Sequence, residues 1–215
     1  ELEFRNDLKK EGKLEFLTGK GEFIRLGAFD EVDMSIMTHA GTSDTRANNY
    51  SGDLVLSAGN NGVVAKRAEF IGLASHAGGS PWNGINALNA ATLALQAIHM
   101  QRETFKDDDS IRVHPIITKG GSAVNAVPDS VNIETYVRGK SLEAIIEAND
   151  KVDRALRAGA MAIGAQVKIT NLGQMLPLMQ DPIMAETYRL NAESLVGKGN
   201  VGEKGHQGGS TDMGD

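Results

Sequence analysis

Between positions 63 and 173, two kinds of segment follow each other along the chain. In one kind the apolar residues have the spacing of a helix, and in the other they have the spacing of a strand. In residues 85–104 the apolar positions recur every three or four residues, as on the buried face of a helix. Residues 131–138 instead alternate between apolar and polar side chains, as in a strand that buries one face. The same patterns predict a strand at 63–75, a further strand in the segment from 111 to the Gly/Ser/Asn/Pro-rich turn, a helix at 141–164 and a strand at 165–173.

The predicted order of these elements is β-α-β-β-α-β. This is the order of a split βαβ, ferredoxin-like sandwich, in which a four-stranded antiparallel sheet carries two helices on one face. The sequence therefore predicts an α+β fold for residues 66–176.

The segments on either side contain too few elements for a domain of their own. They predict a short helix at 17–27, strands at 34–38 and 54–57, and one helix at 182–197. The charged start and the glycine-rich end of the chain favour a piece of a larger protein. In such a piece the two flanking strands are expected to lack neighbours and to expose apolar surface.

Composition excludes several classes of function. The 215 residues carry 40% hydrophobic residues and a formal net charge of -6, without a basic stripe, which argues against nucleic acid as a partner. Cysteine is absent, so disulfides and thiolate chemistry are excluded and any metal must bind His, Asp or Glu. No apolar run approaches the roughly 20 residues that span a bilayer, so no membrane partner is expected.

Four residues are candidates for chemistry. His39 and His76 each lie where a strand gives way to glycine, a place where a side chain can meet a metal or a substrate. Asn125 lies in a tight turn, and its amide can both donate and accept hydrogen bonds. Arg138 ends a polar strand face, and its guanidinium matches a carboxylate. Taken alone, these residues are explained better as a capping or buried histidine, a turn-forming asparagine and a solvated arginine.

Three other histidines and the single tryptophan carry weaker indications. His99 and His114 are expected to be structural, whereas His206 lies in a turn that allows either role. Trp82, six residues after His76, is expected to pack within the sandwich, and the alternative is stacking on an aromatic acyl group of a ligand.

Four segments together resemble the M20 metallopeptidase group, in its branch of aminobenzoyl-glutamate and N-acyl-amino-acid hydrolases. They are GAFDEVDMSIMTHAG, ASHAGGSPWNGINALNAATLALQAIH, GGSAVNAVPDSVNIETYVRG and the terminal GGSTDMGD, and the likeness covers residues 18–215. The resemblance implies a lid or dimerisation domain at 66–176, between partial strips of an α/β catalytic domain at 1–65 and 177–215.

The resemblance also implies roles for the four candidates. His39 matches a ligand of a centre of two divalent metals, zinc or manganese. His76 matches the lid histidine that polarises the scissile carbonyl in the other subunit of a homodimer. Asn125 and Arg138 match residues that hold the substrate, with the arginine on its carboxylate.

The remaining metal ligands and the Glu-Glu pair of the family are missing from the sequence. The chain is therefore expected to be the middle of a cytoplasmic hydrolase that cleaves N-acyl amino acids, aminobenzoyl conjugates included, and to be inactive alone. A non-catalytic dimerisation or ligand-binding module and an M20 dipeptidase or exopeptidase remain as alternatives.

Overall fold

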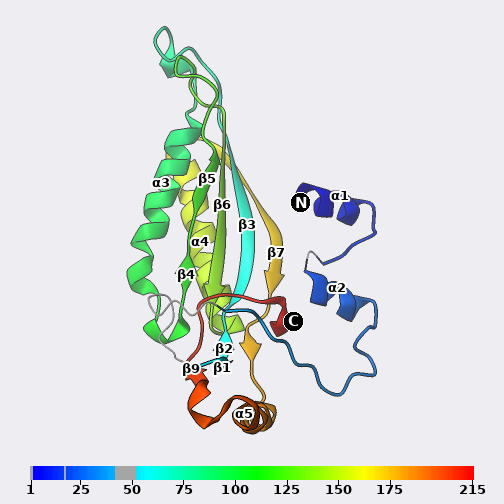
Figure 1. The fold of residues 1–215 in the computed structure, drawn as a ribbon. Coiled ribbons are helices and arrows are strands. Elements are labelled where there is room, and N and C mark those ends of the chain that lie inside the picture. The colour runs from blue at the N-terminus through cyan, green and yellow to red at the C-terminus, as the bar shows by residue number, and fades with distance from the viewer. Residues whose placement is uncertain (1, 17, 42–51) are drawn as a thin grey trace. The chain divides into compact units, whose positions relative to one another are not determined.

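The computed structural model describes residues 2–16, 18–41 and 52–215 (Figure 1). The chain divides into two compact units. One is the sandwich, Val63–Gln174, and the other is the flanking unit, Glu1–Gly62 together with Met175–Asp215. In the described ranges, no helix has the length and apolar character needed to cross a membrane.

The sheet of the sandwich is antiparallel and has four strand positions. Its order is β4-β6-β3-β7, with β5 beside β6 on the same edge as β4. The bounds are β3 (Gly62–Ile71), β4 (Arg112–Val113), β5 (Ile116–Lys119), β6 (Ser130–Gly139) and β7 (Gln166–Met175). The predicted sheet is confirmed.

β4 and β5 are two halves of one edge strand. Arg112 pairs with Arg138, and Ile116 pairs with Glu134, so the register on β6 does not change between the halves. Pro115 lies at the break. Because proline has no N–H to donate, it is tolerated in a sheet only where the strand has a free edge.

Two helices, α3 (Ala87–Met100) and α4 (Leu142–Ile163), cover one face of this sheet (Figure 1). The Ser141 side chain caps α4 by accepting a hydrogen bond from the N–H of Ala144 at 3.2 Å. The helix ends at Gly164, whose φ of 76° is left-handed. The helices touch closely at Gly159, where a Cβ would lie 2.5 Å from the carbonyl oxygen of Ala90. The two predicted helices are confirmed, with the first shorter than expected.

The core lies between the helices and the sheet. Phe70 from β3 and Ile133 from β6 are fully buried there, against alanines of both helices. Alternate residues of the same strands form a polar open face, where the Nε of Arg67 donates to Glu134 at 2.8 Å. Lys66 is the exception, since it is 1% exposed on the helix side and pairs with Asp153 of α4.

The flanking unit contains two small strand pairs. β1 (Leu54–Ser57) runs parallel to β9 (Val201–Lys204), and β2 (Gly59–Asn60) runs antiparallel to β8 (Leu178–Met179). The helices of this unit are α1 (Leu2–Lys10), α2 (Gly19–Arg25) and α5 (Pro182–Val196). The sequence had not indicated α1, because its residues are mainly charged.

The predicted strand at 34–38 is wrong. This segment has no regular structure, and the side chains of Met34 and Ile36 are each 69% exposed. An extended segment becomes a strand only when its backbone bonds to a neighbour, and no described segment pairs with this one. The expected exposure of apolar surface is confirmed for this segment. The expectation that strand 54–57 lacks a neighbour is wrong, because the distant segment Val201–Lys204 pairs with it as β9.

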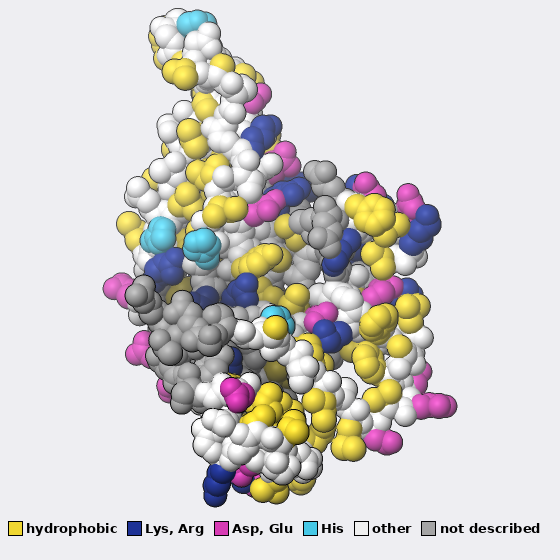
Figure 2. Space-filling model, in the orientation of Figure 1, with side chains coloured by type: hydrophobic (Ala, Val, Ile, Leu, Met, Phe, Trp, Pro, Cys, Tyr) yellow, Lys and Arg dark blue, Asp and Glu magenta, His cyan; other side chains and the backbone are white. Residues whose placement is uncertain are grey.

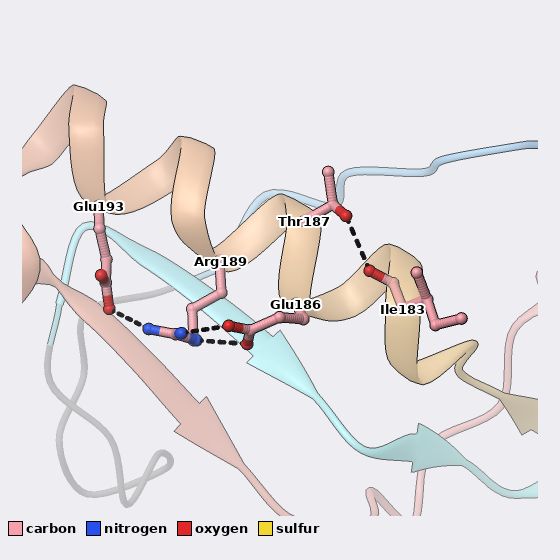
Figure 3. Close-up of polar contacts among 5 residues, drawn as sticks. All are labelled: Ile183, Glu186, Thr187, Arg189 and Glu193. Carbon is pink, nitrogen blue, oxygen red and sulfur yellow. Dashed lines mark hydrogen bonds and ion pairs between the residues drawn. The ribbon is translucent and has the colours of Figure 1, made fainter.

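The two sides of α5 differ in character. Arg189 lies between Glu186 and Glu193, with its Nε 2.7 Å from Glu186 (Figure 3), and these carboxylates raise the pKa of Arg189. The side with Met184 and Leu195 lines a groove of about 520 Å³. Met34, Ile36 and Leu54 line the same groove, so it is largely apolar.

Candidate functional site

His76 and Asn125 lie side by side at the tip of the sandwich, formed by the loops 72–86 and 120–129. The N–H of Ala77 donates to the carbonyl of Asn125 at 2.9 Å, and His76 forms a β-bridge with Ala126. The N–H of Val127 donates to the carbonyl of Ser75 at 2.9 Å. The tip projects from the end of the sheet where β3 stops and β6 begins (Figure 1).

The imidazole of His76 is held in one tautomer by the glycines that follow it. Its Nδ1 accepts hydrogen bonds from the N–H of Gly79 at 2.8 Å and the N–H of Gly78 at 3.2 Å. A neutral ring that accepts at Nδ1 must carry its proton on Nε2. Because the side chain is exposed, Nε2–H is a donor available to a ligand.

The loop that carries His76 is tied to its surroundings at several points. Leu73 and Ile85 exchange two backbone hydrogen bonds, of 2.9 and 3.0 Å, across the loop. The hydroxyl of Ser75 donates to the carbonyl of Ser80. Gly72 must lack a side chain, since a Cβ there would lie 2.1 Å from the carbonyl oxygen of Ile85. The histidine is therefore presented on a constrained turn.

Large apolar side chains surround the tip. Trp82 is 78% exposed, Leu73 is 53% exposed and Val124 is fully exposed. Hydrophobic atoms are visible on the tip of the sandwich in Figure 2. The expectation that Trp82 packs within the sandwich is wrong, because the turn Pro81–Asn83 holds it outside the core. The tip thus combines a hydrogen-bond donor with apolar contact surface.

Arg138 lies at the other end of the sheet. Ser130 is the first residue of β6, next to the tip, and Arg138 lies eight residues further along the strand. At about 3.3 Å per residue, the distance from Ser130 to Arg138 along the strand is roughly 26 Å. Its guanidinium lies over the ring of Tyr136, 5.1 Å from the centroid. One sandwich therefore brings His76 and Asn125 together but leaves Arg138 apart. A shared site remains a prediction that requires a second copy.

His39 has the hydrogen-bonding pattern of a metal-binding histidine but no companion ligands among the described residues. It lies in an irregular, exposed segment, and its Nδ1 donates to the carbonyl of Ala40 at 2.7 Å. The lone pair for a ligand is then on Nε2, as in many metal sites. In residues 2–16, 18–41 and 52–215, no three His, Asp or Glu side chains gather as a metal site. This part of the chain thus does not complete the implied centre.

Two other features could not be assigned from the sequence. His206 bonds through Nε2 to the amide oxygen of Asn61 at 2.7 Å, and Asn61 is buried in the flanking unit, so His206 has a structural contact there. Arg112 lies directly opposite Arg138 on β6. No sequence spacing indicated this pair, because it depends on strand register.

Comparison with known proteins places the sandwich in a family. Residues 58–162 match the family model M20_dimer, described as a peptidase dimerisation domain. The chain is 33% identical over 151 residues to a Xaa-Arg dipeptidase of Mus musculus, covering 70% of this chain and 32% of that protein. It is 29% identical over 183 residues to a p-aminobenzoyl-glutamate hydrolase of Escherichia coli strain K12, covering 83% of this chain and 40% of that protein.

A solved structure shows the same fold. The aminobenzoyl-glutamate utilization protein from Klebsiella pneumoniae superposes with a TM-score of 0.69 at 23% identity, over 90% of this chain and 48% of that one. The chain thus spans between about a third and a half of the proteins it matches. Its similarity to M20 hydrolases was expected from four short segments and is confirmed. Residues 58–162 therefore match the M20 peptidase dimerisation domain, and the chain shares the fold of the corresponding part of the Klebsiella pneumoniae protein.

Proposed function

We propose that this chain is part of a metal-dependent hydrolase that cleaves the amide bond of N-acyl amino acids, aminobenzoyl conjugates included. The observation that carries the proposal is the tautomer of His76, whose Nδ1 is occupied by two backbone donors of the tip. The relatives named above, a dipeptidase and an aminobenzoyl-glutamate hydrolase, support this class of reaction.

The Nε2–H of His76 is suited to the oxygen of a scissile carbonyl. When water adds to the carbonyl carbon, negative charge develops on this oxygen, and a donor already in position stabilises it. Asn125, adjacent to His76 at the tip, can hold the acyl group through its amide. Arg138 binds the carboxylate of the amino-acid part, for which its guanidinium fork is suited.

The proposal includes two divalent ions, zinc or manganese, which would activate the attacking water. His39 is the ligand candidate among the described residues, through its free Nε2. A cytoplasmic location is part of the same proposal.

The separation of Arg138 from the tip supports a homodimer formed through the sandwich. If one copy contributes His76 and Asn125 and the other contributes Arg138, the residues can meet in one cleft although roughly 26 Å of strand separates them within a copy. Small molecules are the expected substrates, without nucleic acid or membrane as partners.

Two alternatives remain. A dipeptidase uses the same groups on a peptide bond, and its support is the similarity to a Xaa-Arg dipeptidase. A non-catalytic dimerisation or ligand-binding module would need only the sandwich.

The test uses the complete protein encoded by the gene, loaded with zinc or manganese, and a panel of N-acyl amino acids and dipeptides. His76→Ala should lower kcat by about 10²- to 10³-fold, whereas His99→Ala, another exposed histidine of the sandwich, should change little. Co-expression of His76→Ala with Arg138→Ala subunits should restore part of the activity, because one site of each mixed dimer then has both residues. If no substrate of the panel is hydrolysed, the enzyme proposal fails and the module alternative stands.

A further inference from the structure

The sequence contains two Asn-Gly pairs, Asn61-Gly62 and Asn83-Gly84, and the structure places them in different surroundings. Asn61 is fully buried in the flanking unit, and its amide oxygen accepts a hydrogen bond from the Nε2 of His206 at 2.7 Å. Asn83 is exposed at the tip of the sandwich, and none of the described residues forms a hydrogen bond with its side-chain amide. An asparagine before glycine is prone to lose its amide, because glycine has no Cβ that hinders the approach of its own nitrogen.

The turn that carries Asn83 is weakly held. Pro81–Asn83 form a single 3-10 turn in which no residue is buried, and the side chain of Ser80 does not cap it. Two backbone hydrogen bonds close the turn, from the N–H of Asn83 to the carbonyl of Ser80 and from the N–H of Gly84 to the carbonyl of Pro81, at 3.1 Å each. A turn with so few bonds and no buried side chain opens readily, and its opening releases the nitrogen of Gly84.

The packing of the tip requires the glycine of this pair. A Cβ at Gly84 would lie 3.0 Å from the carbonyl oxygen of Leu73 and 3.1 Å from the Cγ1 of Val127. The next residue, Ile85, exchanges two backbone hydrogen bonds with Leu73, so the chain after Gly84 stays in place when the turn opens. An exposed asparagine is thus followed by a glycine that the fold cannot replace.

We propose that Asn83 is a site of spontaneous deamidation, with water as the co-reactant. The nitrogen of Gly84 bonds to the side-chain amide carbon of Asn83, the bond from this carbon to the amide nitrogen breaks, and ammonia leaves with the proton that Gly84 gives up. Water then opens the resulting succinimide ring at either of its two carbonyls. The product at position 83 is an aspartate or an isoaspartate, and the isoaspartate makes the main chain one carbon longer.

Deamidation would change the charge of the tip. The loops 72–86 and 120–129 contain one acidic residue, Asp129, and no lysine or arginine. The new carboxylate would lie in the same loop as His76. Where His76 stabilises a developing negative oxygen, an added negative charge opposes that stabilisation. This consequence rests on the proposed function, whereas the modification itself does not.

The experiment incubates the folded complete protein in mildly alkaline buffer and follows both pairs by peptide mapping with mass spectrometry. Conversion at Asn83 should exceed conversion at Asn61 by about tenfold or more, because Asn61 reacts only when its part of the flanking unit opens. The urea-unfolded protein is the matched control, in which both pairs should react at similar rates. Equal conversion at the two pairs in the folded protein, or none at Asn83 while the unfolded control reacts, would overturn the proposal.

Two variants complete the test. Asn83→Gln should abolish conversion at the tip, since glutamine has to close a larger ring, and should leave conversion at Asn61 unchanged. Asn83→Asp, compared with the neutral Asn83→Gln, should lower kcat on an N-acyl amino acid by about threefold to tenfold. Equal kcat in the two variants would remove the effect on His76 and leave the modification standing. Absence of hydrolysis by the wild type would remove the proposed function, and the mass spectra would still decide the modification.

Discussion

The ammonium group of Lys66 forms an ion pair with the carboxylate of Asp153, and so joins β3 to α4 through the layer between sheet and helices. The Lys66 side chain is fully buried, whereas 19% of the Asp153 side chain remains exposed. A buried charge is tolerated only when it is paired, because removal from water is costly. The stability of the packing between α4 and the sheet therefore depends on the carboxylate of Asp153.

Asp153→Asn should lower the free energy of unfolding by about 3 kcal/mol, because it leaves the Lys66 ammonium buried without a counter-ion. Replacing both residues by apolar ones, Lys66→Met with Asp153→Leu, should recover most of the loss. Urea denaturation measures both effects. Arg157→Gln is the control, because Arg157 is 3.7 Å from Asp153 but 64% exposed, and surface pairs contribute less than about 1 kcal/mol. If Asp153→Asn behaved like this control, the pair would not be a structural link.

Gly79→Pro should disturb the tautomer of His76, since proline removes the N–H that Nδ1 accepts at 2.8 Å. The fraction of rings protonated at Nε2 should fall, and kcat should fall with it. Nitrogen-15 NMR of the imidazole measures the tautomer. Gly78→Ala should change neither quantity, because it keeps the N–H and its Cβ would lie an ordinary 3.6 Å from the ring. An unchanged ring spectrum in Gly79→Pro would show that the backbone does not select the tautomer.

Trp82→Ala tests whether the exposed tryptophan of the tip contacts the acyl group. Because Trp82 is 78% exposed, the substitution should leave the stability of the sandwich nearly unchanged. If the indole stacks on aromatic acyl groups, kcat/KM should fall by about threefold to tenfold for aminobenzoyl substrates and little for acetyl substrates. Steady-state kinetics on both series measures the difference. An equal loss on both series would remove the stacking role.

Arg112→Thr should stabilise the sandwich by about 0.5 kcal/mol, because it removes the cation directly opposite Arg138. Threonine also has a high strand preference. The urea midpoint in the absence of ligand measures the effect. A clear loss of stability would instead indicate a structural role for Arg112.

Glu22 should titrate well below an ordinary glutamate. The Arg25 guanidinium, together with the N–H groups of Phe16 and Glu15, lowers its pKa to about 2 from an ordinary 4.5, against the opposing effect of burial. Because the folded pKa is depressed, the stabilisation from Glu22 is fully present above pH 4.5 and is lost as the pH falls towards 2. NMR titration of the carboxyl carbon measures the midpoint. Arg25→Gln should raise it, and a wild-type midpoint near 4.5 would contradict the contact.

The helices and strands of the sandwich could be predicted from the sequence because their causes are local. A buried face imposes a period of about 3.6 residues on a helix and 2 on a strand. Ser141 and Gly164 mark the ends of α4 through contacts within one turn. The position of His76 and Asn125 in glycine-rich turns could also be predicted, because the glycines lie within a few residues of each of them in the sequence.

Other features depended on which distant segments meet, and only the tertiary structure decided them. The apolar segment 34–38 is not a strand, because pairing needs a neighbour that its own residues cannot specify. Trp82 lies outside the core although its side chain is large and apolar. The tautomer of His76 depends on how the tip folds back on its ring. The opposition of Arg112 and Arg138 depends on the register of two strands, and a shift of one residue would send Arg112 to the other face.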